Sequence, residues 1–161
     1  MNRIEKVKYD GTRVRIEYSV ERQDGRFDER VLSCYDEPIP EFKTALAALV
    51  EDVCDICELP ADQAEKMRVQ SVSLSYTNDI LGLVITALKS VKTAQSPVVL
   101  NTPHIPAQSY AEGGEGPVLA DNTLMRVETV TREAERYIDG ERAQQSLPMP
   151  VESIELTLAH A

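Results

Sequence analysis

The stretch that decides the fold is Val14-Arg15-Ile16-Glu17-Tyr18-Ser19-Val20-Glu21, in which apolar and polar residues alternate. This period of two is typical of a β-strand with one buried face and one face in water. Asp10-Gly11 precedes the stretch and Asp24-Gly25 follows it, and Asp-Gly supplies the positive φ angles of tight hairpin turns. The pattern predicts an antiparallel meander whose strands are residues 4–9, 12–22 and 26–34.

Helical spacing follows the meander. Phe42, Ala45, Leu46, Leu49, Val53 and Ile56 predict one helix from Glu41 to about Glu58, ended by Pro60. Residues 62–66 fit one further turn. Asp121 or Asn122 is then expected to cap a second helix, which Asp139-Gly140 either ends or merely weakens. Its apolar stripe is Leu124, Val127, Thr131, Ala134 and Ile138, which fits either packing on a sheet or self-association.

A second set of strands lies between the helices. Val72, Leu74 and Tyr76 alternate with serines, and Thr77-Asn78-Asp79 is a turn signal. The apolar run 80–91 fits a buried strand or a helix by periodicity, and the hairpin signal favours a strand. Pro97 marks residues 97–100 as an edge strand, and residues 103–121 are expected to form a long loop.

Together these elements predict an α+β fold, in which two helices cover an antiparallel sheet made of the meander and a second hairpin set. Residues 1–147 are expected to form a single domain, since 161 residues suit one core. Residues 148–161 form a tail in which Ile154, Leu156 and Leu158 alternate with polar residues. The tail fits an extra strand, docked on its own chain or on a neighbouring subunit.

Composition limits the class of protein. The net charge of −10 disfavours binding to duplex nucleic acid. No apolar run is long enough for a membrane span, and the N-terminus has no secretory signal. The three cysteines, Cys34, Cys54 and Cys57, are therefore expected to be reduced thiols in a cytoplasm.

Cys54 and Cys57 have the spacing of a redox pair or half a zinc site. They stand at the end of the predicted first helix, whereas redox pairs use a helix N-terminus to lower the thiol pKa. A structural zinc needs four ligands, and the further candidates are only Cys34, His104 and His160. We therefore expect packed thiols and no metal or cofactor.

The residues also argue against catalysis. There are two histidines, and no serine or cysteine lies in a recognisable nucleophile motif. The glycine-rich segment 113–116 lacks the lysine and the context of a phosphate-binding loop. We therefore expect a protein that is not an enzyme.

A binding surface is predicted around the start of the long loop and the second helix. Asn101 and Thr102 offer donors and acceptors, and His104 offers a donor that depends on pH. Arg132 and Arg136 are one turn apart and suit an anion, although mixed charges on a helix also form salt-bridged surfaces. The predicted binding residues, for a nucleotide-like or peptide anion, are Asn101, Thr102, His104, Arg132, Arg136 and Tyr137.

Several segments resemble a family of small proteins carried by tailed phages and prophages. They are Ser33-Cys34 with Asp36-Glu37-Pro38, Pro40-Glu41-Phe42, Ile56-Cys57-Glu58-Leu59-Pro60, Asn101-Thr102-Pro103-His104, and Tyr137-Ile138-Asp139-Gly140 with Arg142-Ala143-Gln144. The tail from Pro148 is longer than is usual in that family. The resemblance implies a phage context, and it brings no established activity and no catalytic residues.

We therefore expect a phage or prophage accessory protein, located in the host cytoplasm, that self-associates and binds a host or phage protein or a small anionic ligand. One alternative is a replication or recombination accessory protein that binds single strands, or that docks on a sliding clamp through residues 144–148, which weakly resemble a clamp-binding peptide. Arg13 and Arg15 suit single strands, but parity places Tyr18 on the opposite face of their strand. A second rival hypothesis is a counter-defence protein that sequesters a nucleotide signal or blocks a host complex, and a third is a hydrolase that uses His104.

Overall fold

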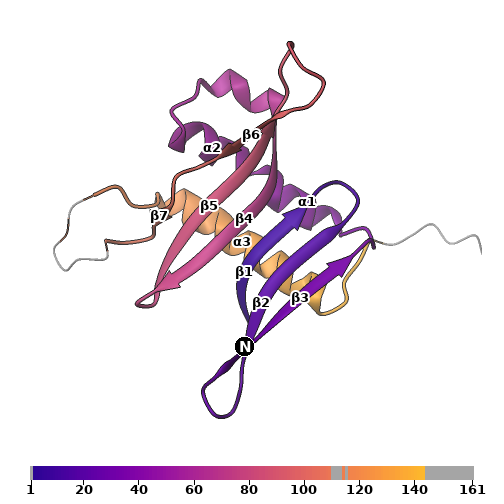
Figure 1. Cartoon of the computed structure of the whole chain (residues 1–161), viewed down its shortest axis with the longest axis vertical. Coiled ribbons are helices and arrows are strands. Elements are labelled where there is room, and N and C mark those ends of the chain that lie inside the picture. Colours follow the sequence, from indigo (N-terminus) through magenta and orange to yellow (C-terminus); the bar gives the residue numbers. More distant parts are fainter. Residues whose placement is uncertain (1, 110–113, 115, 144–161) are drawn as a thin grey trace, which may run out of the picture.

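The meander is confirmed. The structure, a computed structural model, describes residues 2–109, 114 and 116–143. It places β1 (Asn2–Tyr9), β2 (Val14–Glu21) and β3 (Phe27–Cys34) in consecutive antiparallel pairs (Figure 1). At the first turn, Asp10 accepts hydrogen bonds from the backbone N–H groups of Arg13 and Thr12, and these bonds lower the pKa of the Asp10 carboxyl to about 2. Gly11 supplies the positive φ of 98° that the turn needs.

The second hairpin is also present. It consists of β4 (Met67–Thr77) and β5 (Ile80–Lys89), joined by a turn in which Asn78 and Asp79 both have positive φ. Asparagine and aspartate tolerate this conformation better than most residues, which is why the turn forms here. The ambiguous run 80–91 therefore begins as a strand, in agreement with the turn signal.

One sheet joins the two hairpin sets. Its order is β3-β2-β1-β4-β5-β6, with β7 (Ile105–Pro106) also paired to β5, which makes seven strands. β6 (Val98–Asn101) is the edge strand expected after Pro97. The meander meets β4 through only three residue pairs, between Lys6–Lys8 and Ser71–Ser73. The predicted α+β class with an antiparallel sheet is confirmed.

The first predicted helix is divided. The chain forms α1 (Pro40–Ala47) and α2 (Val50–Ile56), followed by the 3₁₀ turn η1 (Ala61–Lys66). At the break, the N–H of Leu49 bonds to the carbonyl of Leu46, which is the tighter 3₁₀ pattern. Because Leu49 is fully buried, the break redirects the chain without losing the apolar face. Apolar spacing alone does not reveal such a break.

The third helix, α3 (Asp121–Ile138), differs from the prediction in its buried stripe. Its N-cap is Ala120, so Asp121 is its first residue, where a carboxylate interacts favourably with the helix dipole. The predicted stripe is correct at Val127 and Ala134. The residues that complete the buried stripe are Thr123, Val130, Glu133 and Tyr137. Apolar spacing overlooks Thr123 and Tyr137 because each buries a hydroxyl that finds a hydrogen-bond partner inside the protein. The helix packs on α1 and on β1 of the sheet, so of the two expected alternatives, packing on a sheet or self-association, the structure shows the first.

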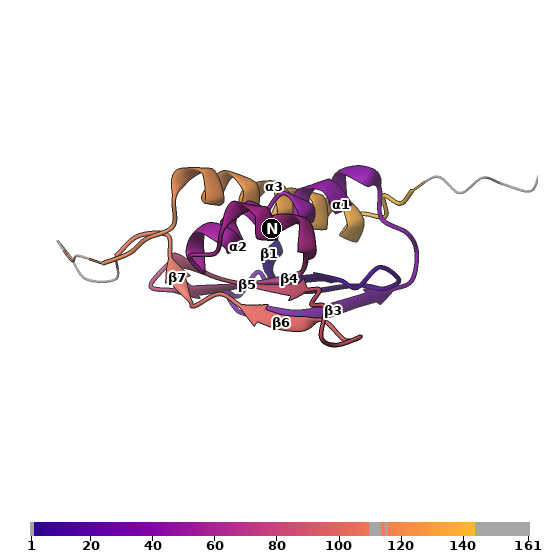
Figure 2. The ribbon, with the colours of Figure 1, turned by 90° about the horizontal axis from the view of Figure 1, so that it is seen from above.

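All the described helices lie on one face of the sheet (Figure 2). Tyr137 ties this layer together, because its buried hydroxyl donates to the carbonyl of Asp36, 2.7 Å away, in the loop between β3 and α1. Its ring packs on Phe42 of α1, and the Arg142 guanidinium lies 3.4 Å from the ring centroid. Burial raises the pKa of Tyr137. Tyr137, one of the predicted binding residues, is therefore part of the core.

No described helix has the length and apolarity needed to cross a membrane. The predicted strand in the tail and the predicted clamp-binding segment 144–148 lie outside the described residues.

Replacing Tyr137 by Phe removes the hydroxyl and keeps the ring. We expect the free energy of unfolding to fall by about 1–2 kcal/mol, because the buried carbonyl of Asp36 loses its donor. Urea denaturation measures the change. Met125→Ala on the exposed side of the same helix is the control, with an expected change within about 0.5 kcal/mol. Equal stability of Tyr137→Phe and wild type would contradict the assigned role.

Candidate functional site

The sheet has a face that no described helix covers (Figure 2). We call it the open face and define its centre by Lys6, Lys8, Arg15, Ser71, Ser73, Thr86 and Asn101. Side chains alternate along a strand, so the burial of Val7 against the helices places Lys6 and Lys8 on the other side of β1. The same parity places Arg15 there, between the buried Val14 and Ile16. The open face therefore gathers basic residues in a protein whose net charge is −10.

The strand register brings these residues side by side. Lys8 lies opposite Arg15 on one neighbouring strand and opposite Ser71 on the other. Lys6 lies in the same way between Glu17 and Ser73. Each lysine of the central strand thus has a serine on one side, of which Ser71 is buried, and Lys6 has the Glu17 carboxylate on the other side.

The row of polar groups continues to the edge of the sheet. Ser71 is opposite Thr86, and Thr86 is opposite Asn101. The Thr86 hydroxyl donates to the Asn101 side-chain oxygen at 2.7 Å. Asn101, predicted as a binding residue, thereby forms the outer end of the open-face row.

The charges of the open face are only partly neutralised within the protein. Arg15 forms an exposed ion pair with Glu17 at 3.5 Å, which contributes little in water. None of the ion pairs found in the described part of the chain involves Lys6 or Lys8. These two lysines are available to an anion that approaches the open face.

Arg3 lies between two aromatic rings at the N-terminal end of β1. Its guanidinium is 4.5 Å from the ring centroid of Phe27 and 4.9 Å from that of Tyr76, so it forms cation–π contacts with both. Parity places Phe27 on the open face, where it remains 41% exposed, and Tyr76 on the side of the helices. The Tyr76 hydroxyl donates to the carbonyl of Ile4, and burial raises the pKa of Tyr76.

His104 lies across the backbone of β5. Its Nε2 is 3.1 Å from Ser75 Oγ, and a Cβ on Gly82 would stand 2.0 Å from that nitrogen. Ser75 and Gly82 are opposite each other on β4 and β5, next to the buried Leu74 and Leu83, so the exposed imidazole lies on the open face. A serine and a histidine within hydrogen-bond reach also occur in nucleophile–base pairs.

Thr102 has a structural position. It is buried, its hydroxyl accepts the N–H of Ile85 at 2.9 Å, and its own N–H bonds to the carbonyl of Ile85. These bonds continue the pairing of β5 beyond β6. Thr102 therefore holds the chain in place ahead of His104 and presents little surface to a ligand.

The two predicted arginines lie in the helical layer. Arg136 forms ion pairs with Glu133 at 3.0 Å and Glu141 at 2.9 Å, and the hydrogen bonds from Arg136 to these carboxylates raise the pKa of Arg136. Arg132 lines a small hollow with Asn2 and other residues. The sheet thus separates the α3 residues from Asn101 and His104, and the six predicted residues do not form one site.

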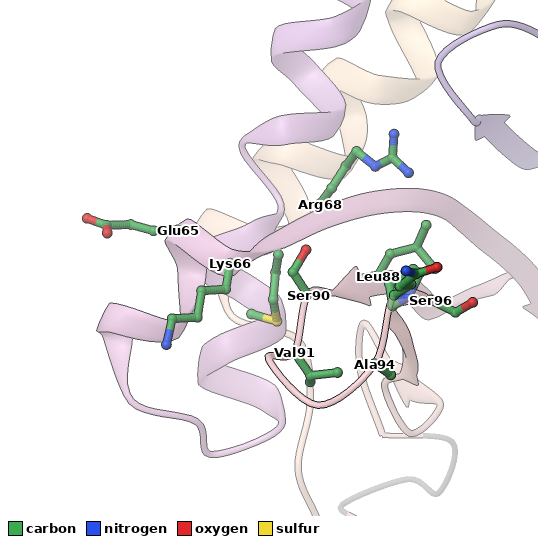
Figure 3. Close-up of a pocket in the computed structure, with 11 residues that line it drawn as sticks. Glu65, Lys66, Arg68, Leu88, Ser90, Val91, Ala94 and Ser96 are labelled. Atoms are coloured by element: carbon green, nitrogen blue, oxygen red, sulfur yellow. The ribbon is translucent and has the colours of Figure 1, made fainter.

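Cavities lie elsewhere. One of about 480 Å³ is formed by the start of β4 and the loop after β5, and includes Lys66, Arg68 and Ser90. Figure 3 shows that Lys66 and Arg68 project in opposite directions, so they do not converge on one anion. Another, of about 520 Å³, lies between α1 and α3. Neither is lined by Lys6, Lys8 or Arg15.

The thiols and carboxylates do not suggest a metal centre. Burial raises the pKa of Cys54 and of Cys57, which keeps both thiols protonated. Within the described ranges, no three His, Cys, Asp or Glu side chains are placed to hold a metal ion.

Gly82→Ala tests the position of His104. The added methyl group is expected to displace the imidazole and break its bond to Ser75, while the sheet persists because the clash is with the end of a side chain. NMR should show large shifts of the His104 ring signals, and the protein should lose about 1 kcal/mol of stability. Gly25→Ala is a control for the His104 signals alone, because a Cβ at Gly25 meets nothing within 4 Å, whereas its positive φ of 82° makes an alanine there cost stability by itself. Unchanged His104 signals in Gly82→Ala would refute the described packing.

Comparison of the chain with protein-family models, with curated proteins and with solved structures finds no match in any of the three.

Proposed function

We propose that the chain is a non-catalytic accessory binding protein of a phage or prophage, and that its open face holds the phosphate backbone of single-stranded nucleic acid. The observation that carries the proposal is the placement of Lys6, Lys8 and Arg15 on adjacent strands of the uncovered face. The phage context is supported by the segments that resemble phage proteins. A role at nucleic acid also fits the expected location in the host cytoplasm.

The shape of the site favours an extended ligand. Small molecules bind in concave sites that cover most of their surface, whereas the basic residues here lie on a sheet surface outside the two cavities. Lys6 and Lys8 are two residues apart on one strand, so their attachment points are about 7 Å apart. A charged polymer lying along the sheet can contact both.

The charge distribution favours a single strand over a duplex. Proteins that bind single strands combine a basic surface with aromatic rings on which bases stack. Phe27 and His104 provide exposed rings on the open face, on either side of the basic centre. The acidic remainder of the protein would repel the dense charge of a duplex.

Neutralising the two lysines tests the proposal. Binding of a fluorescent oligothymidine should weaken about tenfold or more in Lys6→Gln/Lys8→Gln at low salt. The magnitude of the slope of log affinity against log salt should fall by about 1.4, because each lost phosphate contact to a single strand removes about 0.7. Fluorescence anisotropy over a salt series measures both quantities.

Lys89→Gln/Lys92→Gln is the matched control, because it removes the same charge from the end of β5 and the following loop. This control should bind like the wild type. Absence of binding at low salt, or an equal loss in the control, would refute the proposal. Equal affinity for polyglutamate would also refute it and would point to an acidic protein partner instead.

A further inference from the structure

β3 is an exposed edge of the sheet. Among the described residues it pairs with β2 alone, through all eight of its positions. Val31 is 54% exposed and Tyr35, just beyond the strand, is 74% exposed. Unpaired edge strands are templates for pairing with another strand, so β3 can accept one.

The turn before β3 defines which of its backbone groups point outward. The N–H of Arg22 bonds to the carbonyl of Arg26, which makes these two residues a hydrogen-bonded pair. Hydrogen-bonded and non-hydrogen-bonded pairs alternate along an antiparallel ladder. The even-numbered residues of β3 therefore bond to β2, and the odd-numbered ones, such as Glu29, Val31 and Ser33, direct their N–H and C=O groups to the free edge.

Two copies can pair through β3 about a two-fold axis in only a few registers. A two-fold axis perpendicular to the sheet keeps the open faces of the two copies on the same side. The outward-pointing backbone groups of the two β3 strands must also meet, so odd-numbered residues must lie opposite odd-numbered residues. An axis at Glu29 places two glutamates opposite each other, and an axis at Arg30 does the same with two arginines. Like charges directly opposite destabilise a sheet, which disfavours both registers.

An axis at Val31 avoids these conflicts. Val31 then lies opposite the partner's Val31, in a hydrogen-bonded pair formed by outward-pointing backbone groups. Glu29 lies opposite the partner's Ser33, and Arg30 opposite the partner's Leu32. The charged half of β3 thus meets the uncharged half of the other copy, and Phe27 approaches the partner's Tyr35. An axis at Leu32 also avoids like charges but pairs a shorter stretch of the strand.

We propose that two copies of this chain pair antiparallel through β3, with Val31 on the two-fold axis. The two sheets then form one continuous sheet with both open faces on the same side. This arrangement doubles the basic surface that one extended polymer can contact. The pairing depends only on the β3 edge, so it stands or falls separately from nucleic-acid binding.

Light scattering of the full chain after size-exclusion chromatography tests the pairing. The wild type should have the mass of a dimer, and Val31→Lys, which places two like charges on the axis, should have the mass of a monomer. Val99→Lys is the matched control on the opposite edge strand, where the valine is 56% exposed, and it should remain a dimer. Circular dichroism should show that both variants fold.

A monomeric wild type at all concentrations would overturn the proposal. A dimer that persists in Val31→Lys, or one that is lost in Val99→Lys, would also overturn it.

Cysteine substitution tests the register. In Val31→Cys the two Cα atoms should be about 5.5 Å apart, within the range that a disulfide spans. Oxidation should therefore yield a covalent dimer. In Glu29→Cys the two copies of the new residue are separated by four positions, about 13 Å along the strand, and should not cross-link. The oxidised wild type controls for the native cysteines. Cross-linking of Glu29→Cys without Val31→Cys would overturn the Val31 register.

Discussion

The burial of Val7 is the constraint on which the rest of the structure depends. Val7 lies at the centre of the sheet, opposite Ile16 on β2 and Val72 on β4, and all three are fully buried. The Val7–Val72 pair belongs to the short contact that joins the two hairpin sets into one sheet. Because a strand alternates its side chains, the same contact presents Lys6 and Lys8 on the opposite face. The pairing of β1 thus buries Val7 in the core and places the lysines of the candidate binding surface on the other face.

The open face stays uncovered because the helices contact one another as well as the opposite face of the sheet. Asp52 of α2 is buried, and its Oδ1 accepts hydrogen bonds from Thr123 at 2.6 Å and Arg126 at 2.9 Å, both on α3. At the other end of α3, Tyr137 bonds to the loop before α1. Buried polar groups stabilise only when they are paired, so these contacts fix how the helices pack. The whole helical layer is thereby kept on one side.

Much of this fold could be predicted from local patterns. Alternation and the Asp-Gly turns predict the meander, and Asn78-Asp79 predicts the second hairpin, because these signals act over a few residues. The break at Leu49 escapes such patterns, since both halves of the helix keep the same apolar spacing. Tyr137 and Thr102 resemble binding residues in the sequence because they carry polar groups. Inside the fold these groups bond to backbone atoms, which a sequence pattern does not show.

The open face could be identified only from the structure. Parity places Lys6, Lys8 and Arg15 on one side of their strands, but whether that side is covered depends on how three distant helices pack. A local basic surface can also act in an acidic protein. Charges more than about 10 Å apart are largely screened at about 0.1 M salt, so an anion at the sheet centre responds chiefly to the nearest residues. The net charge of −10 therefore limits long-range attraction more than it limits contact at the open face. If the open face binds a polymer and copies pair as proposed, aligned copies would strengthen binding because one polymer would then contact several equivalent sites.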